Sequence, residues 1–215
     1  MRTKVMLVLM LGAAAFTGSA QVRWGVEAGV NISHALETSK TKAGFNAGAT
    51  AEYSFNNHWF MDAALKLSSQ PCGDKYDNIF INQSDDATYG FDSNYTPYYL
   101  TLPVRAGYKL AVGSDAVISL AAGPAIGVGL FGKTSMTFNG LSEHARKVDT
   151  HRIFSSKSAG CFSSSRMEYG FNVRLGVELK KHYTLGAEYS LFHIPGKITA
   201  VDNVNLFSIN VGYKF

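Results

Sequence analysis

The last nine residues of the chain are Phe207-Ser208-Ile209-Asn210-Val211-Gly212-Tyr213-Lys214-Phe215. The bulky side chains of Phe207, Ile209, Val211, Tyr213 and Phe215 alternate with small or polar ones up to the final residue. Neighbouring side chains of a strand point to opposite faces. The alternation therefore predicts a β-strand with one apolar face and one polar face.

Seven further segments show the same two-residue period, and they span residues 23–32, 44–55, 59–68, 98–109, 118–130, 167–179 and 183–191. With 207–215 they number eight, and single-chain bacterial outer-membrane barrels have an even number of strands. We therefore predict an all-β fold, an eight-stranded antiparallel up-and-down transmembrane β-barrel of the outer-membrane type. The five bulky terminal residues are then expected to form a C-terminal signature read by the barrel-assembly machinery.

The amino end has the features of an export signal. Arg2 and Lys4 precede an apolar run from 5 to 11, and Gly18-Ser19-Ala20 supplies the small residues of a cleavage site. The run is shorter than the roughly 20 apolar residues that a membrane-spanning helix needs. These features predict a signal peptide at 1–20 and a barrel domain at 21–215.

The composition fits a barrel and argues against a nucleic-acid partner. Loss of the two basic leader residues lowers the formal net charge from +4 to +2, which is too small for a polyanion-binding protein. The 21 glycines, 13% aromatic residues and 17% charged residues suit tightly packed strands with aromatic belts. No glycine-rich phosphate loop, zinc spacing or calcium loop is present in the sequence, so we expect no cofactor and no metal.

The predicted connections alternate in length. Those after the second, fourth and sixth segments are short, whereas long outer loops are predicted at about 70–94 and 132–165. Short periplasmic turns and long outer loops are typical of these barrels. Aromatic side chains mark the short-turn end as a membrane interface: Trp24, Tyr53, Phe55, Trp59, Tyr108, Tyr183, Tyr213 and Phe215.

Charge decides which face of the strands points inward. The polar faces carry six positive and six negative side chains: Arg23, Lys66, Arg105, Lys109, Arg174, Lys214, Glu27, Glu52, Asp62, Glu168, Glu178 and Glu188. The interior of an eight-stranded barrel is just wide enough for side chains to fill, and an unpaired buried charge there costs several kcal/mol. We therefore predict a lumen closed by an ion-pair network of Glu27, Glu52, Asp62, Lys66, Arg105, Arg174, Glu178 and Glu188. The alternative is a soluble, lipocalin-like cup with an apolar interior and an exterior of salt bridges.

The two longest predicted loops carry one cysteine each and opposite charges. Cys72 and Cys161 would enter an oxidising compartment after export, which favours a disulfide, with two free thiols as the alternative. Residues 70–94 have a net charge of −4 and residues 132–166 a net charge of +4. The two loops could therefore fold over each other, the basic one could bind lipopolysaccharide phosphates, or both could be solvated.

Short motifs resemble the PorT-type outer-membrane β-barrel domain of Bacteroidetes. They are Tyr98-Tyr99-Leu100-Thr101-Leu102-Pro103-Val104, then Ala122-Gly123-Pro124, then the ending Gly212-Tyr213-Lys214-Phe215. The resemblance implies an eight-stranded barrel in the outer membrane of a Gram-negative bacterium, with a possible link to protein secretion. Because proline cannot donate to a strand ladder, bulges are expected at Pro103 and Pro124.

The sequence contains no spacing that demands catalysis. His34, His144, His151 and His193 lie in or beside predicted outer loops, where serine and glutamate are also plentiful. We therefore predict a non-enzymatic module of the cell envelope, which is either structural or binds an envelope or secretion protein. A lipid A-modifying enzyme with a His-Ser-carboxylate site and a narrow pore or small-ligand barrel are the alternatives. Outer-membrane lipid and lipopolysaccharide are the expected surroundings.

Overall fold

The computed structural model describes residues 22–35, 40–80, 88–139, 146–150, 153–154, 166–195 and 203–215. The strands are β1 (Val22–Ala35), β2 (Lys40–Ser54), β3 (Trp59–Ser69), β4 (Cys72–Phe80), β5 (Thr88–Val112), β6 (Ala116–Asn139), β7 (Arg146–Thr150), β8 (Met167–Leu179), β9 (Tyr183–His193) and β10 (Asn203–Lys214). The predicted signal peptide, 1–20, lies outside the described residues. Within the described ranges, no helix is long and apolar enough to cross a membrane.

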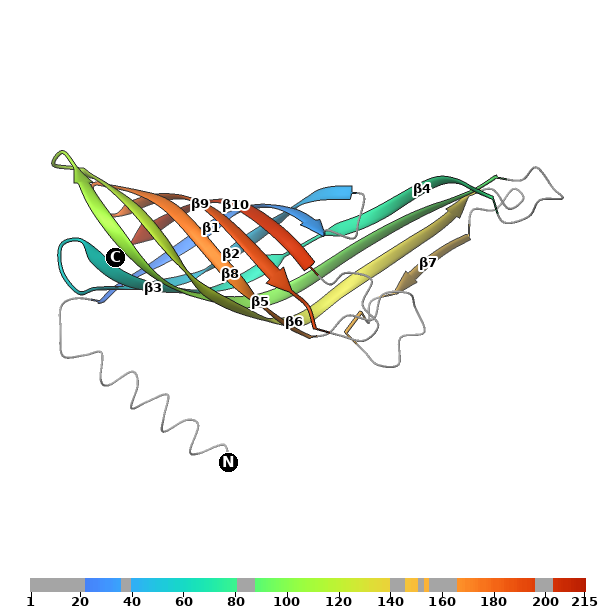
Figure 1. Ribbon diagram of the computed structural model, residues 1–215, viewed down its shortest axis with the longest axis horizontal. Coiled ribbons are helices and arrows are strands. Elements are labelled where there is room, and N and C mark those ends of the chain that lie inside the picture. The colour runs from blue at the N-terminus through green and yellow to red at the C-terminus, as the bar shows by residue number, and fades with distance from the viewer. Residues whose placement is uncertain are drawn as a thin grey trace, which may run out of the picture.

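Eight of the ten strands form a closed antiparallel ring (Figure 1). Their order is β1-β2-β3-β5-β6-β8-β9-β10, and β10 closes the ring by pairing with β1, for example Ile209 opposite Val30. Each of these strands therefore has a partner on both sides, which removes the exposed edges of an open sheet. The predicted eight-stranded up-and-down barrel is confirmed.

The apolar face of each barrel strand points outward and the charged face points inward. On β1, Trp24 and Val30 are each 58% exposed, whereas Glu27 between them is 5% exposed. The neighbouring β10 repeats this arrangement, with Ile209 outside and Asn210 inside. An exterior of bare aliphatic and aromatic side chains is stable in lipid and not in water. The barrel therefore spans a membrane, and the alternative of a soluble, apolar-lined cup is wrong.

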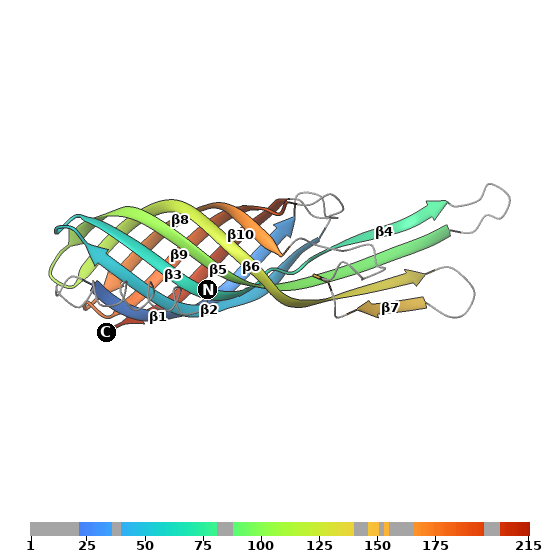
Figure 2. The ribbon, with the colours of Figure 1, turned by 90° about the horizontal axis from the view of Figure 1, so that it is seen from below.

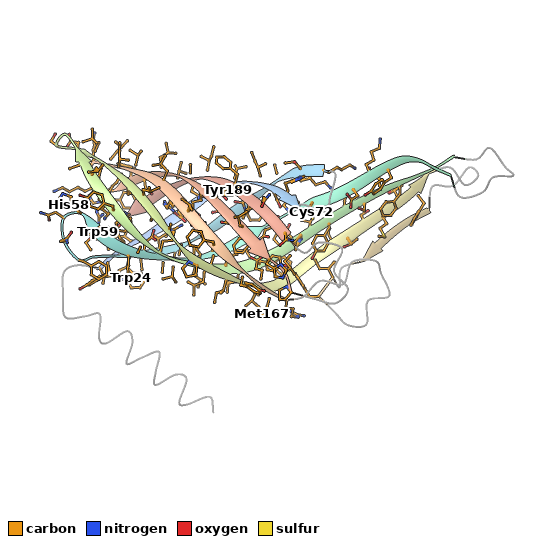
Figure 3. All side chains as sticks on the ribbon, viewed as in Figure 1. Trp24, His58, Trp59, Cys72, Met167 and Tyr189 are labelled. Carbon is orange, nitrogen blue, oxygen red and sulfur yellow. The ribbon has the colours of Figure 1, made fainter. Side chains whose placement is uncertain are left out.

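One end of the barrel has short turns, at 55–58, 113–115 and 180–182. Figure 3 shows Trp24, His58 and Trp59 at this end, while Cys72 and Met167 lie at the other end of the barrel. The Trp59 ring packs edge-on against Tyr108 at 5.1 Å, and Tyr213 contacts Tyr183 and Phe215 at 5.6 and 5.8 Å. These contacts form the aromatic belt expected at a membrane interface.

At the opposite end, part of the barrel wall continues far beyond the other strands (Figure 2). β5 has 25 residues and β6 has 24, and their outer halves pair with β4 and β7 to give the order β4-β5-β6-β7. We call this extension, formed by β4, residues 88–97 of β5, residues 132–139 of β6, and β7, the outer sheet. The segments predicted as loops at 70–94 and 132–165 thus contain strands, and both belong to this one sheet.

The barrel wall bends into the outer sheet at a β-bulge. Tyr98 pairs with Phe131 and Tyr99 pairs with Gly129, so Leu130 is an extra residue in β6. A bulge bends and twists the strand that carries it. It also turns the consecutive residues Leu130 and Phe131 both outward, where they are 43% and 53% exposed.

The bulges predicted at the two prolines are absent. Pro103 pairs with Ala125 in the same register as Ala106 with Ala122, and Pro124 pairs with Phe171 in the unbroken register of β6 and β8. Proline removes a single hydrogen-bond donor from the ladder, and the strands tolerate that loss without inserting a residue.

The outward-facing apolar wall predicts that a charged side chain destabilises the barrel by an amount that depends on its position along the wall. Replacing Ile209 with arginine places a cation in the middle of the lipid-facing wall, and we expect a loss of about 2–4 kcal/mol in the free energy of unfolding. Thr137, on the outer sheet, is the control because Thr137→Arg adds the same charge outside the membrane. Urea unfolding of both variants in lipid vesicles measures the difference, and equal losses would contradict the proposed membrane boundary.

Candidate functional site: the lumen and its outer mouth

The end of the lumen near the short turns is closed by five charged side chains. Arg23 bridges two carboxylates, with Glu52 at 2.9 Å and Glu178 at 2.7 Å. The Lys214 ammonium lies 2.6 Å from Glu52 and 2.8 Å from Glu178, and Lys109 donates a short hydrogen bond to Glu52. We call this group the mouth network. It joins β1, β2, β5, β8 and β10, so it can form only when the ring is closed.

A second network lies deeper in the lumen and centres on Glu188. This carboxylate receives Lys66 Nζ at 2.6 Å, Arg174 Nη1 at 2.5 Å and Arg105 Nη1 at 3.3 Å. Glu27 forms ion pairs with two of the same cations, with Lys66 Nζ 3.1 Å from Oε1 and Arg174 Nη1 2.6 Å from Oε2. Two carboxylates therefore share three cations, which removes the repulsion that either set would suffer alone.

Arg105 balances the charge of this central network. Its Nε and Nη2 atoms both lie 2.8 Å from the carboxylate of Asp62, a two-pronged pairing, and Nη1 donates to the amide oxygen of Asn172 at 2.8 Å. The Arg105 side chain has no solvent exposure. A guanidinium can be buried this deeply because two of its N–H groups point at the two oxygens of one carboxylate, which matches the planar shape of both groups.

The two networks contain all eight residues of the predicted lumen set. Glu52 and Glu178 belong to the mouth network, and Glu27, Asp62, Lys66, Arg105, Arg174 and Glu188 belong to the central network. Arg23, Lys109 and Lys214 join the mouth network as further members, and the sequence had placed them on the same inward faces.

Amide and hydroxyl groups form the next layer towards the outer end. Asn31 donates to Ser68 Oγ at 3.0 Å and accepts from Asn46 at 2.6 Å and from Ser208 at 2.8 Å. We did not predict this layer, although asparagine recurs on the inward faces at 31, 46, 172 and 210. Its neutral groups continue the filling of the lumen without further charge.

An apolar plug covers the outer mouth of the lumen, at the end opposite the mouth network. Its buried members are Ala35, Cys72, Tyr95, Tyr99, Ala125, Met136, Ile153, Phe192, Ile194, Val204 and Leu206. Ile153 and Ile194 lie outside the barrel strands, so connecting segments contribute to the plug. Two cavities lined by described lumenal residues measure about 30 and 20 Å³, and each has room for one or two water molecules.

Glu168 lies buried on β8, apart from both networks. It receives one hydrogen bond, from the Gln70 amide at 3.0 Å, and its other carboxylate oxygen has no hydrogen-bond partner among the described residues. Glu168 was predicted to face the lumen, and it does so without a cation beside it. It is therefore the one described lumenal carboxylate that the ion pairs leave out.

Two of the four histidines predicted beside outer loops, His34 and His193, lie in the described residues and contact neutral groups. His34 Nδ1 lies 3.2 Å from Thr41 Oγ1, and His193 Nδ1 lies 3.1 Å from Asn203 Oδ1, with the Tyr169 ring edge-on at 5.3 Å. His144 and His151 lie outside the described residues. Within the described ranges, no group of three or more His, Cys, Asp or Glu side chains is placed to hold a metal ion.

Removing the central carboxylate should strongly destabilise the barrel. The Glu188→Ala substitution leaves three buried cations with fewer carboxylate partners, namely Lys66, Arg105 and Arg174. We expect a loss of about 3–5 kcal/mol in the free energy of unfolding. Asp92→Ala is the matched control, because it breaks an ion pair that water can reach. The side chains of Lys40 and Asp92 are 27% and 29% exposed, and such pairs contribute less than about 1 kcal/mol. Urea unfolding in vesicles compares them, and similar losses would show that the lumenal pairs do not stabilise the fold.

The disulfide between Cys72 and Cys161 stays a prediction, because Cys161 lies outside the described residues. Cys72 opens β4 within the apolar plug. A bridge would close a long loop and stabilise the fold by about 4 kcal/mol at most. We expect neither cysteine to react when the protein is unfolded and alkylated without reductant, as read by mass spectrometry. Labelling of both would rule the bridge out.

Comparison with solved structures finds small barrels of similar length. Ail, the attachment invasion locus protein of Yersinia pestis, is 14% identical, covers 91% of this chain and 99% of its own, and gives a TM-score of 0.40. Neisserial surface protein A is 15% identical over 90% of this chain and 95% of its own, with a TM-score of 0.43. The outer membrane enzyme PagL is 12% identical over 87% and 97%, with a TM-score of 0.39. Likenesses this distant carry no argument about activity.

At the level of sequence, no curated protein matches the chain. A family description does match, that of the outer membrane protein beta-barrel domain, and the match runs from residue 4 to residue 215. This range contains every barrel strand and both lumenal networks. The chain therefore belongs to the outer membrane protein beta-barrel domain family of Gram-negative bacteria.

Proposed function

We propose that this protein is a non-enzymatic interaction module of the cell envelope, which holds the outer sheet rigidly above the membrane for a protein partner. The length of β5 is the observation that carries the proposal. A strand crosses a membrane with about 9–11 residues, whereas the 25 residues of β5 extend for about 80 Å. The excess length serves no purpose inside the bilayer.

The outer sheet is continuous with the barrel wall. The pairing of β5 with β6 runs from Gly90 opposite Asn139 down to Val112 opposite Ala116. Because one hydrogen-bonded ladder extends through both parts, the outer sheet inherits the rigidity of the barrel. A preorganised surface loses less entropy on binding than a mobile loop does.

The outer sheet also carries an exposed row of aromatic side chains. Tyr76 on β4, Phe91 on β5 and Phe138 on β6 are directly opposite one another, with ring centroids 6.4 and 5.4 Å apart. Tyr76 is 50% exposed and Phe138 is 39% exposed. Aromatic residues are enriched at protein interfaces, so this row favours a protein partner.

The sequence motifs suggest the biological setting. Their resemblance to the PorT-type domain of Bacteroidetes supports export by the signal peptide at 1–20, residence in a Bacteroidetes outer membrane and a partner in protein secretion. The terminal residues from Phe207 to Phe215 would engage the barrel-assembly machinery during insertion, and lipopolysaccharide would surround the outer half of the barrel. The filled lumen argues against the narrow pore.

The aromatic row predicts where a partner would be captured. A photo-cross-linking amino acid at Tyr76 or Phe138 should yield one discrete protein adduct in intact cells, whereas the same probe at the wall residue Leu120 should not. Tyr76→Ser should weaken the adduct formed from position 138 several-fold without changing the amount of folded barrel. Identical adducts from position 120, or none from either sheet position, would refute the partner-binding role.

The same strains distinguish the alternatives. We expect no change in the lipid A mass spectrum when the gene is deleted and no steady conductance from the purified barrel in planar bilayers. Altered lipid A acylation would favour the enzyme, and stable conductance would favour the pore. Loss of secreted proteins in the deletion strain, with rescue by wild type and not by Tyr76→Ser, is expected if the partner belongs to a secretion system.

A further inference from the structure

Two of the three short turns of the barrel are built from residues that suit their backbone. In the turn at 55–58, the Asn56 side chain accepts hydrogen bonds from the backbone N–H groups of His58 and Trp59, both at 2.8 Å. In the turn at 113–115, Gly113 has a φ of 76°, which glycine adopts without a steric penalty. Asparagine and glycine are the residues that tight turns favour, so these two turns need no special explanation.

The third short turn, at 180–182 between β8 and β9, has two lysines in the left-handed region. Lys180 has a φ of 50° and Lys181 a φ of 65°, and among the described residues no other non-glycine residue has a positive φ. The N–H of His182 donates to the Leu179 carbonyl at 3.2 Å and closes the turn. Two left-handed residues at the centre of a turn are the geometry of type I′, which strongly prefers Asn-Gly. The chain therefore keeps two lysines where the backbone disfavours them.

Neighbouring strands and turns fix the backbone of this strained turn. The N–H of Lys180 donates to the Asp115 carbonyl at 2.7 Å, and the carbonyl of His182 accepts from the backbone of β10 at 2.7 Å. The Arg23 guanidinium donates to the Lys181 carbonyl at 3.4 Å. Strained residues persist only where the surrounding structure holds them, and they concentrate at functional sites. The contacts use backbone groups of the turn and leave both lysine side chains available.

The two lysine side chains are exposed and carry unneutralised charge. Both residues are exposed, and neither is in an ion pair with any residue that the structure describes. Asp115 meets Lys180 through the backbone of both residues. The other nearby carboxylates, those of Glu52 and Glu178, are already neutralised by the three cations of the mouth network. The turn thus presents two positive charges to the periplasm.

The contact with Arg23 decides which surroundings these charges face. Arg23 points into the lumen, where it pairs with Glu52 and Glu178. Its hydrogen bond therefore places the Lys181 carbonyl over the periplasmic mouth of the lumen, away from the lipid-facing wall. A partner that reaches this position comes from the periplasmic water, which favours a soluble anion over a lipid headgroup.

We propose that Lys180 and Lys181 form a binding site on the periplasmic rim of the barrel for an acidic segment of a periplasmic protein. The rigid turn holds the two ammonium groups in place, so carboxylates of the partner bind them with little loss of backbone entropy. The strain explains why the turn has not been built from Asn-Gly, which would fold better and bind nothing. The site lies at the opposite end of the barrel from the outer sheet and does not depend on the partner proposed there.

The barrel can be reconstituted in nanodiscs of phosphatidylcholine, which has no net charge, and titrated with fluorescent hexaglutamate. We expect wild type to bind this peptide about tenfold more tightly than hexaglutamine, as read by fluorescence anisotropy. The double variant Lys180→Asn, Lys181→Gly should lose about tenfold in affinity for hexaglutamate, because each exposed ion pair contributes a factor of about three. Lys180→Arg, Lys181→Arg should retain binding.

A second measurement on the same variant tests the strain. Lys180→Asn, Lys181→Gly should unfold at a higher urea concentration than wild type, because Asn-Gly suits the type I′ turn. A lower midpoint would overturn the argument that the lysines are kept at a cost in stability. The prediction therefore couples a gain in stability to a loss of binding, which a variant that merely misfolds does not show.

The matched control removes two exposed cations from the outer sheet at the other end of the barrel. Lys75→Gln, Lys133→Gln should bind hexaglutamate as wild type does. Unchanged affinity in Lys180→Asn, Lys181→Gly, or an equal loss in the control, would overturn the site. The amount of phosphatidylglycerol that co-purifies, read by native mass spectrometry, should be the same in wild type and in this variant. Less lipid on the variant would overturn the choice of a protein partner.

Discussion

The structure depends on neutralising charge inside a barrel too narrow for bulk water. Lys66, Arg105 and Arg174 converge on Glu188, although Lys66 and Glu188 are 122 residues apart in sequence. An unpaired charge in this interior would cost several kcal/mol, so the network is complete only when all the strands that contribute to it are in register. The lumenal charges are therefore neutralised only when the ring closes, because Lys214 on β10 must reach Glu52 on β2.

The same constraint moves the functional surface away from the lumen. Ion pairs, the amide layer and the apolar plug fill the channel along its length, and the cavities between them hold a water or two. A barrel of this kind can act through its lipid-facing wall, its connections and whatever extends beyond the membrane. The long ladder of β5 and β6 makes that extension rigid.

Much of the barrel could be predicted from the sequence, because lipid outside and charge inside produce a strict two-residue period. The outer sheet could not, because its buried face includes polar residues such as Ser93 and Thr134. Segments such as 92–96 therefore show little contrast in hydropathy between their two faces. The residues of the lumenal networks could be predicted, but their ion pairs could not. Arg105 pairs with Asp62 and Glu188 because the register of strands distant in sequence brings these side chains together. The bulge at Tyr98 likewise reflects the bend into the outer sheet, whereas the two prolines suggested other positions.

Strand geometry places the aromatic row on one face of the outer sheet. Phe91 and Asn94 are three residues apart on β5, so their side chains point to opposite sides. Phe91 packs against the apolar plug and shares its face of β5 with the buried Tyr95, so the aromatic row faces the side that continues the lumen. The barrel wall would then orient this partner surface, because both belong to the same hydrogen-bonded strands.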